Sequence, residues 1–284
     1  MDEYDIHIKP KRHLFEVDFK ALWRYRDLLR MLVYRDFVTY YKQTILGPLW
    51  FFIQPMFTAA INLFIFGTVG GLGPEGVPGF LFYLCGPILW QYFQDTFTKT
   101  SSTFIENQHI FGKVYFPRLI MPLTTLISGL LKFGVQLLLL AVAIFYYFGT
   151  TGAWSVQWKI VFFPVVLIII MMLSLGFGLI VSALTTKYRD LKFLIDFGVP
   201  LLKYITPGIA TSMAIFKEKT PDYLLPLAEY NPMGYLIDTF NYMFVGAGDF
   251  SWSSLGFAAL SAGVILGLGI LIFNQTEKNF MDTV

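Results

Sequence analysis

The chain has 284 residues, of which 56% are hydrophobic and 14% charged, and its formal net charge is +2. A soluble domain usually carries about 25% charged residues, so this composition excludes an ordinary soluble protein and predicts an integral membrane protein. A total charge so close to zero gives no indication of a nucleic-acid partner.

The first part of the chain is polar and then amphipathic. Charges are distributed throughout residues 1–20, without the apolar stretch and cleavage site of a signal peptide, so we expect this segment to be retained. Between residues 19 and 46, apolar side chains recur at spacings of three, four and seven, namely Leu22, Leu29, Val33, Phe37, Tyr41 and Ile45. The basic opposite face predicts an amphipathic helix lying in the membrane interface. A helix packed on a soluble domain is the alternative interpretation.

Long apolar stretches follow. A helix needs about 20 mostly apolar residues to cross the hydrocarbon core of a bilayer. On this basis we predict six transmembrane helices, at residues 49–69, 80–97, 119–148, 160–184, 194–216 and 252–273. Pro87 is expected to kink the second helix, and Pro200 and the pair 207–208 interrupt the fifth. Residues 223–227 and 233–245 are too short to span, and we expect a re-entrant helical pair on the outer side.

The distribution of basic residues predicts the orientation. With a cytoplasmic N-terminus, the cytoplasmic side holds Lys9, Lys11, Arg12, Lys20, Arg24, Arg26, Arg30, Arg35, Lys42, Lys99, Lys113, Arg118, Lys187, Arg189, Lys192 and Lys278. The outer side then has only Lys159, Lys217 and Lys219. We therefore predict an all-α integral membrane protein with both termini in the cytoplasm. It forms one domain over residues 1–284, with an interface segment at 1–48, the six-helix part at 49–273 and a cytoplasmic tail at 274–284.

Motifs for nucleotide binding, metal binding and catalysis are missing from the sequence. There is no G-x-x-x-x-G-K-[ST] pattern, so any ATP energy must come from a partner subunit. His7, His13 and His109 stand in polar segments without an H-E-x-x-H pattern or clustered cysteines, and we predict no metal site. The single cysteine, Cys85, is expected to be a buried, inert thiol. We expect neither a cofactor nor enzymatic activity in this chain.

Two further features concern the predicted spans. Small residues at helical spacing indicate close helix contacts, at Ser174, Gly178 and Ser182 and at Gly263 and Gly267. Lys132, Asp196 and Lys203 lie within spans, where an ionised side chain costs roughly 2.5 to 3.5 kcal/mol on insertion. Lys132 is the deepest of these three residues. It either borders a polar pathway that attracts phosphate, or it snorkels or pairs with an acidic neighbour.

Aromatic residues concentrate in the first two predicted spans. An aromatic face packs against the C–H surface of a sugar ring and offers few directional hydrogen bonds that would trap it. The candidates for a substrate pathway are therefore Lys132 and the aromatic residues Trp50, Phe51, Phe52, Tyr83, Trp90 and Tyr92. For each aromatic residue, a place in the lipid-facing aromatic belt or in helix packing is the alternative.

Four segments carry a resemblance to a known family, namely residues 40–50 (YYKQTILGPLW), 106–118 (ENQHIFGKVYFPR), 187–191 (KYRDL) and 230–237 (YNPMGYLI). Each segment alone is a weak signal, but their order on six predicted spans is more specific. The chain resembles, over nearly its whole length, the permease subunit of polysaccharide-exporting ABC transporters of the type 2 exporter family. That family handles O-antigens, capsules and teichoic acids.

The resemblance implies a homodimer with a pore along its two-fold axis. It also implies two copies of a separate ATPase subunit that binds ATP and Mg on the cytoplasmic face. Residues 104–116 are then the coupling helix, and residues 188–193 a smaller contact. The candidate residues for ATPase coupling are Glu106, Asn107, His109, Phe111, Lys113, Tyr115, Tyr188, Arg189 and Asp190.

The resemblance also implies a polyprenyl-pyrophosphate-linked polysaccharide as cargo, and an outer gate within residues 223–245. The gate candidates are Tyr230, Asn231, Pro232 and Tyr235. Basic residues near the inner leaflet attract anionic headgroups at about 1 kcal/mol each. The candidates for holding the lipid headgroup are Arg24, Arg26, Arg30 and Arg35. A positive-inside anchor without a ligand explains the same arginines and stays open.

Other functions remain as alternatives. A drug or other lipid exporter of the same architecture is the main rival within transport. A membrane transferase acting on polyprenyl substrates should show acidic clusters for Mg²⁺, whereas Asp95, Asp190 and Asp196 are isolated in the sequence. A structural membrane scaffold does not explain Lys132. The expected location is the bacterial inner membrane, with multiple passes.

Overall fold

The computed structural model describes residues 18–42, 44–74, 76–111 and 116–280, and these residues form helices without any strand. The α-helices before the middle of the chain are α1 (Phe19–Arg24), α2 (Arg26–Lys42), α3 (Trp50–Asn62), α4 (Gly79–Ser101), α5 (Thr103–Glu106), α6 (Gln108–Phe111) and α7 (Ile120–Thr151). Those after it are α8 (Phe163–Lys187), α9 (Leu191–Ile205), α10 (Met213–Lys219), α11 (Leu225–Glu229), α12 (Pro232–Val245) and α13 (Trp252–Phe280). Shorter elements are η1 (Gly47–Leu49), η2 (Leu63–Val69), η3 (Trp158–Phe162) and η4 (Asp222–Leu224).

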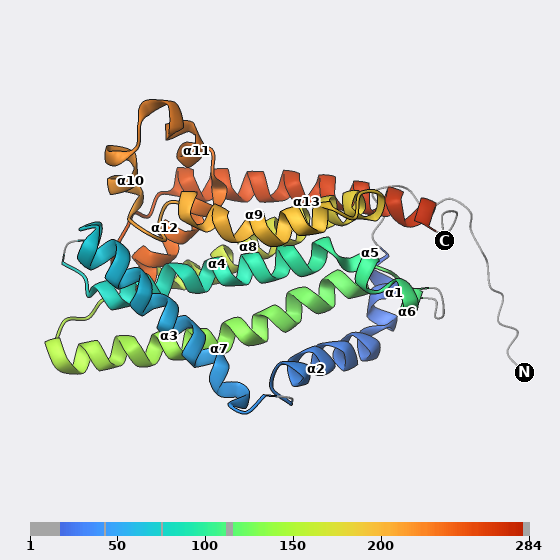
Figure 1. Cartoon of the computed structure of the whole chain (residues 1–284), viewed down its shortest axis with the longest axis horizontal. Helices are drawn as coiled ribbons and strands as arrows, with labels where there is room; N and C mark the ends of the chain where they lie inside the picture. Colours follow the sequence, from blue (N-terminus) through green and yellow to red (C-terminus); the bar gives the residue numbers. More distant parts are fainter. Residues whose placement is uncertain (1–17, 43, 75, 112–115, 281–284) are drawn as a thin grey trace, which may run out of the picture.

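The long helices lie roughly along one axis of the molecule (Figure 1). In that view α1, α5, α6 and the C-terminal part of α13 gather at one end, and α10, α11 and α12 gather at the other. The described ends of the chain therefore lie at the same end of the bundle. This arrangement agrees with an even number of crossings.

Four of the predicted spans form helical segments long and apolar enough to cross a membrane, namely Gly47–Val69, Ile120–Thr151, Trp158–Lys187 and Trp252–Glu277. The second predicted span became α4, which lies in the centre of the bundle with most of its residues buried. The fifth became α9, which has only 15 residues. Neither helix meets the criteria of length and composition, so six spans are not established on these criteria.

The fifth predicted span was too long. α9 ends at Ile205, and Thr206 already has an extended backbone with ψ of 121°. The reason is Pro207, because the ring of a proline disfavours a helical conformation of the residue before it. Gly208 then has a φ of +87°, and the chain turns before it enters the separate short helix α10.

The amphipathic helix predicted for residues 19–46 is also shorter and broken in two. α1 begins after Asp18, whose Oδ1 atom accepts a 2.8 Å hydrogen bond from the amide of Ala21. α2 ends at Lys42, and Ile45, predicted on the apolar stripe, is fully exposed. Among the residues of this part whose burial is described, Leu32 is the most buried, and it packs on the bundle next to α7.

Buried side chains form two clusters. The larger one joins α4, α7, α8, α12 and α13. The smaller one lies at the end of the bundle that carries α2 and α5, and its buried members are Leu32, Phe104, Phe111, Phe116, Ile120, Met121, Leu179 and Phe273. We call this smaller cluster the aromatic end cluster. It attaches the first helices of the chain to the last one.

Glycines allow the closest helix contacts. A Cβ atom added to Gly178 would lie 2.5 Å from Cβ of Thr100 on α4, and one added to Gly176 would lie 2.7 Å from the backbone of Leu266 on α13. The predicted contact at Gly178 is therefore confirmed. Gly263 and Gly267 make no such close contact within the described part of the chain, because a Cβ atom there has open space or ordinary contact at 4.0 Å.

The region predicted as a re-entrant pair contains η4, α11 and α12. α12 is not a surface segment, since it packs against α4, α8 and α13 and buries residues such as Leu236, Ile237 and Phe240. α11 has only five residues and is mostly exposed. The insertion of this pair into the outer leaflet stays a prediction.

Candidate functional site

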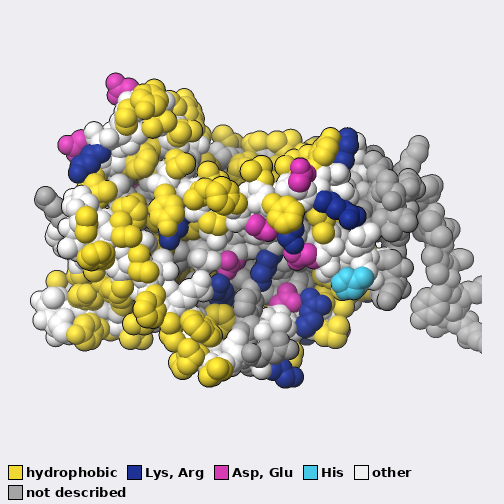
Figure 2. All heavy atoms as spheres, in the orientation of Figure 1, with side chains coloured by type: hydrophobic (Ala, Val, Ile, Leu, Met, Phe, Trp, Pro, Cys, Tyr) yellow, Lys and Arg dark blue, Asp and Glu magenta, His cyan; other side chains and the backbone are white. Residues whose placement is uncertain are grey.

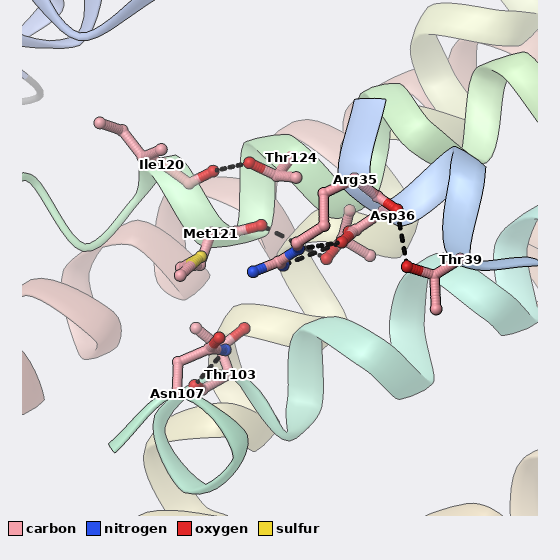
Figure 3. Close-up of polar contacts among 9 residues, drawn as sticks. Arg35, Asp36, Thr39, Thr103, Asn107, Ile120, Met121 and Thr124 are labelled. Atoms are coloured by element: carbon pink, nitrogen blue, oxygen red, sulfur yellow. Dashed lines mark hydrogen bonds and ion pairs between the residues drawn. The ribbon is translucent and has the colours of Figure 1, made fainter. Parts of the chain in front are cut away.

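A cavity opens between α2 and the bundle at the end that carries α5. Its volume is about 520 Å³, and its lining residues are Arg35, Asp36, Thr39, Lys99, Thr103, Glu106, Asn107, Met121, Thr124 and Thr125. These residues come from α2, α4, α5 and α7 and from Asn107, which follows α5. We call it the α2–α7 cavity. Figure 3 shows Arg35 and Asp36 extending from α2 toward Met121 and Thr124 of α7.

Most of the residues that line the cavity are polar or charged. The guanidinium of Arg35 donates from Nη2 and Nε to Oδ1 of Asp36, at 2.8 and 3.1 Å. Threonine hydroxyls, the Asn107 amide, Glu106 and Lys99 complete a wall that contains both hydrogen-bond donors and acceptors. Charged side chains also gather over this end of the molecule in the space-filling view (Figure 2). Such a cavity can hold a hydroxylated or anionic group.

The structure separates the four candidate headgroup arginines. Arg35 lines the α2–α7 cavity. Arg24, Arg26 and Arg30 are exposed; the guanidinium of Arg26 lies 5.4 Å from the ring centroid of Trp23, and that of Arg30 lies 3.7 Å from Asp27. Only one of the four candidates therefore contributes to the cavity.

The predicted pathway residue Lys132 forms an ion pair with Asp95. The distance from Nζ of Lys132 to Oδ2 of Asp95 is 2.6 Å, and their side chains are 14% and 23% exposed. Gln91 donates a 2.6 Å hydrogen bond from Nε2 to the other carboxylate oxygen. Of the two interpretations of Lys132, pairing with an acidic neighbour is thus confirmed. The pair joins α4 to α7, and both helices also line the α2–α7 cavity.

The aromatic pathway candidates lie mostly inside the packed bundle. Tyr83, Trp90 and Tyr92 are buried, and Trp90 donates from Nε1 to Oε1 of Gln94 at 2.9 Å. In the first span Phe51 is buried, Phe52 is half-buried and Trp50 is 47% exposed. Their role in a substrate pathway stays a prediction.

The two predicted ATPase contacts lie side by side. Nζ of Lys192, at the start of α9, lies 2.7 Å from Oε1 of Glu106 at the end of α5. The hydrogen bond to Glu106 raises the pKa of Lys192. Asn107 donates from Nδ2 to the carbonyl of Thr103 and so stabilises the turn after α5. Residues far apart in sequence thus meet on one surface.

The remaining coupling candidates differ in their placement. Phe111 is buried in the aromatic end cluster, and His109 is exposed on α6. Tyr188, Arg189 and Asp190 are exposed at the turn between α8 and α9. Lys113 and Tyr115 lie outside the described residues.

At the opposite end, Asn231 caps α12. Its Oδ1 atom accepts hydrogen bonds from the amides of Met233 and Gly234, at 3.0 and 3.3 Å, and its Nδ2 donates to Oγ1 of Thr206 at 3.3 Å. Pro232 occupies the first turn of α12, where its missing N–H has no cost. Of the other gate candidates, Tyr230 is 74% exposed, and the ring of Tyr235 packs edge-on at 6.0 Å against Phe257.

A comparison with known families decides the class of the protein. The model of the family described as ABC-2 type transporter matches residues 27–245, which run from α2 to the end of α12. The chain belongs to the ABC-2 type transporter family. The matched region of this ABC-2 transporter chain contains the α2–α7 cavity, the Asp95–Lys132 pair and the cap of α12.

Individual relatives cover nearly the whole chain. The O-antigen export system permease protein RfbA of Klebsiella pneumoniae is 28% identical over 257 residues, which are 90% of this chain and 94% of the relative. The O-antigen export system permease protein RfbA of Myxococcus xanthus is 26% identical over 266 residues, which are 93% and 98% of the two chains. The chain is thus similar to O-antigen export permeases and is a transport subunit, as predicted.

Two further residues of this ABC-2 transporter chain were missed by sequence reasoning. Arg118 is 5% exposed and donates from Nη1 to the carbonyl of Glu277 at 2.8 Å, and its guanidinium lies 5.6 Å from the ring centroid of Phe111. Asp238 on α12 accepts hydrogen bonds from the amides of Met213 and Asp249. A basic residue just before an apolar span, and an acidic one within an apolar segment, were the available signals.

The described residues contain no group of three or more His, Cys, Asp or Glu side chains suited to a metal ion. Cys85 is fully buried in α4. The arrangement around the α2–α7 cavity instead provides donors and acceptors for binding.

Proposed function

We propose that this chain is the permease subunit of an ATP-driven exporter that moves a lipid-linked, O-antigen-like polysaccharide out of the cytoplasm. The α2–α7 cavity carries the proposal, because it joins polar binding groups to the surface that bears the predicted ATPase contacts. The similarity to O-antigen export permeases over 90% of the chain supports the choice of cargo.

In this proposal the chain crosses the bacterial inner membrane six times, with both termini in the cytoplasm. α4 and α9 would be the fifth and sixth membrane-crossing helices, in addition to the four segments that are long and apolar enough to span. α4 is surrounded by α3, α7, α8 and α12, so its polar residues face protein rather than lipid. The cytoplasmic side is then the end that carries α2, α5 and α6, as the excess of basic residues there suggests.

The cargo headgroup would bind at the α2–α7 cavity. Arg35 is the arginine best placed to contact a phosphate, since its guanidinium lines the cavity and carries several donors. Arg24, Arg26 and Arg30 would instead contact the anionic membrane surface. A volume of about 520 Å³ accommodates a phosphate group with the adjoining sugar.

Energy would come from two copies of a separate ATPase subunit that bind ATP and Mg. Their contact surface would include α5, α6 and the turn before α9, which the Glu106–Lys192 ion pair joins. A homodimer of the chain would form the pore. At the outer side, α12 and its Asn231 cap would border the exit.

Deletion and complementation test the function. Deleting the gene should abolish surface polysaccharide and cause lipid-linked glycan to accumulate inside the cell. The wild-type gene should restore export, and the Arg35→Gln variant should restore it only weakly. Arg24→Gln is the matched control, since this exposed arginine is absent from the cavity lining. Normal surface polysaccharide in the deletion strain would contradict the proposal.

Export of a drug or another lipid is the second candidate, because the ABC-2 type family match does not itself specify a cargo. The deletion strain distinguishes the two. Increased sensitivity to amphiphilic compounds with normal surface polysaccharide would favour this alternative. A polyprenyl transferase, in contrast, should form product without ATP in purified membranes.

A further inference from the structure

Two helices present facing polar stripes that are partly buried at the side of the bundle. On α4, Gln91, Asp95 and Lys99 follow one another at four-residue spacing and thus share one face. On α7, the matching polar residues recur at spacings of three or four, at Thr125, Ser128, Lys132 and Gln136. The Asp95–Lys132 ion pair fixes the register of the two stripes.

Successive cavities follow these stripes. The α2–α7 cavity shares Lys99 and Thr125 with a cavity of about 10 Å³ that is also lined by Asp95, Thr96, Ser128, Gly129 and Lys132. The next cavity, of about 20 Å³, is lined by Gln91 and Gln136 together with Gln54, Pro55, Thr58, Pro87, Ile88 and Lys203. The hydrogen bond from Gln91 to Asp95 links these two small cavities. Each is about the size of one water molecule, so the track is closed in this conformation.

Packing of α4 against α7 does not by itself require the polar residues of the two stripes. A buried ion pair between helices is often no more stabilising than apolar residues of similar size, because both charges lose their hydration. Nearby, Oγ of Ser128 is buried and has no hydrogen-bond partner in the described part of the chain. Because buried hydroxyl groups are normally hydrogen-bonded, we expect a water molecule or a ligand to bind this one.

We propose that Gln91, Asp95, Ser128 and Lys132 form a binding track for the hydroxyl groups of a sugar chain, as one protomer's part of the wall of the dimer pore. The proposal rests on the proposed function and deepens it. Asp95 accepts hydrogen bonds from sugar hydroxyls, and Lys132 and Gln91 donate to their oxygens. Alternating donors and acceptors suit a polyhydroxylated ligand, because each hydroxyl both donates and accepts. In the closed state the Asp95–Lys132 and Gln91–Asp95 contacts satisfy these groups among themselves.

A double variant separates binding from packing. Asp95→Leu combined with Lys132→Leu removes both charges together, so no unpaired charge is left in the bundle. We expect surface polysaccharide per permease in the membrane to fall about tenfold or more, the effect of losing hydrogen bonds to charged groups. The matched control is Lys217→Ala with Glu229→Ala, which removes the exposed 3.9 Å pair at the other end and should leave export unchanged. If the leucine variant exports polysaccharide at the wild-type level, the ion pair serves only helix packing and does not bind the sugar chain.

Thiol labelling tests the track independently of export. In a Cys85→Ala background, Ser128→Cys should react with a water-soluble maleimide during ATP turnover by the full transporter. The control Leu140→Cys, at a fully buried position of α7, should not react. Ser128→Cys that stays unlabelled in cells with normal export overturns the track and leaves the proposed function intact. A different result would be that Ser128→Cys is labelled but deleting the gene leaves surface polysaccharide unchanged. The track would then be accessible to water, but a sugar chain would not be its ligand.

Discussion

The ring of Phe104 on α5 stacks on the ring of Phe273 on α13, with centroids 4.8 Å apart and an angle of 27° between the planes. Both residues are almost fully buried in the aromatic end cluster. The stack attaches the segment predicted to contact the ATPase to the last helix of the bundle. A force on α5 would therefore reach α13 through direct packing.

Removing this stack should destabilise the protein. We expect Phe104→Ala to lower the free energy of unfolding by about 3 kcal/mol or more, because a large buried ring leaves a cavity that neighbours fill only in part. Thermal unfolding of the purified protein in detergent measures this loss. The control Phe197→Ala, at a position that is 70% exposed on α9, should have little effect. Equal stability of the two variants would show that the stack is not a structural contact.

Arg118 should hold the end of α13. Replacing Arg118 with Gln removes the hydrogen bond to the carbonyl of Glu277 and should cost about 1.5 to 3 kcal/mol, since the lost bond involves a charged donor. Hydrogen exchange in residues 274–280 should then become faster. Arg118→Lys should restore only part of the protection, because an ammonium cannot stack on Phe104 and Phe111 as a planar guanidinium does. Unchanged exchange in the Gln variant would contradict this role.

Two glycine variants test helix contact. Gly178→Ala places a methyl group 2.5 Å from Cβ of Thr100, so α4 and α8 must separate, and the yield of folded protein should fall. Gly267→Ala meets nothing within 4 Å and should be neutral or slightly stabilising. Size-exclusion profiles and thermal unfolding of the two proteins report the difference. If both variants behave alike, the close approach of α4 and α8 is not required.

The contribution of the Asn231 cap to the stability of α12 should be measurable separately from other contacts. Asn231→Ala removes the acceptor of the Met233 and Gly234 amides and should cost about 1 kcal/mol. We expect faster hydrogen exchange at these two amides. Tyr230→Ala, next to the cap but 74% exposed, should leave their exchange unchanged. The cap has no role if the two variants give the same exchange rates.

The Glu106–Lys192 pair should contribute modestly to ATPase binding, which is part of the proposed function. An exposed ion pair is worth about 0.2 to 1 kcal/mol, so Lys192→Glu should weaken the affinity for the ATPase subunit by up to about fivefold. The double variant Glu106→Lys with Lys192→Glu should recover most of this loss. Binding measured by biolayer interferometry at low salt would show the recovery. A double variant weaker than either single one would argue against the contact.

Much of the fold follows from the sequence itself. The apolar stretches around Leu126, Leu173 and Ala262 predicted helices that the structure contains. A transmembrane helix satisfies its backbone hydrogen bonds within its own segment, so its length and composition are enough to predict it. The break at Pro207 was likewise visible, although its consequence, a helix of only 15 residues, was not.

Tertiary structure alone decided which polar residues meet. Asp95 and Lys132, Glu106 and Lys192, and Arg118 and Glu277 are distant in sequence, and no local period specifies how one helix is rotated against another. The same holds for the α2–α7 cavity, which needs four helices, and for the place of Arg35 rather than Arg24 in its wall. A helix period fixes which residues share a face, whereas packing in three dimensions determines what that face contacts.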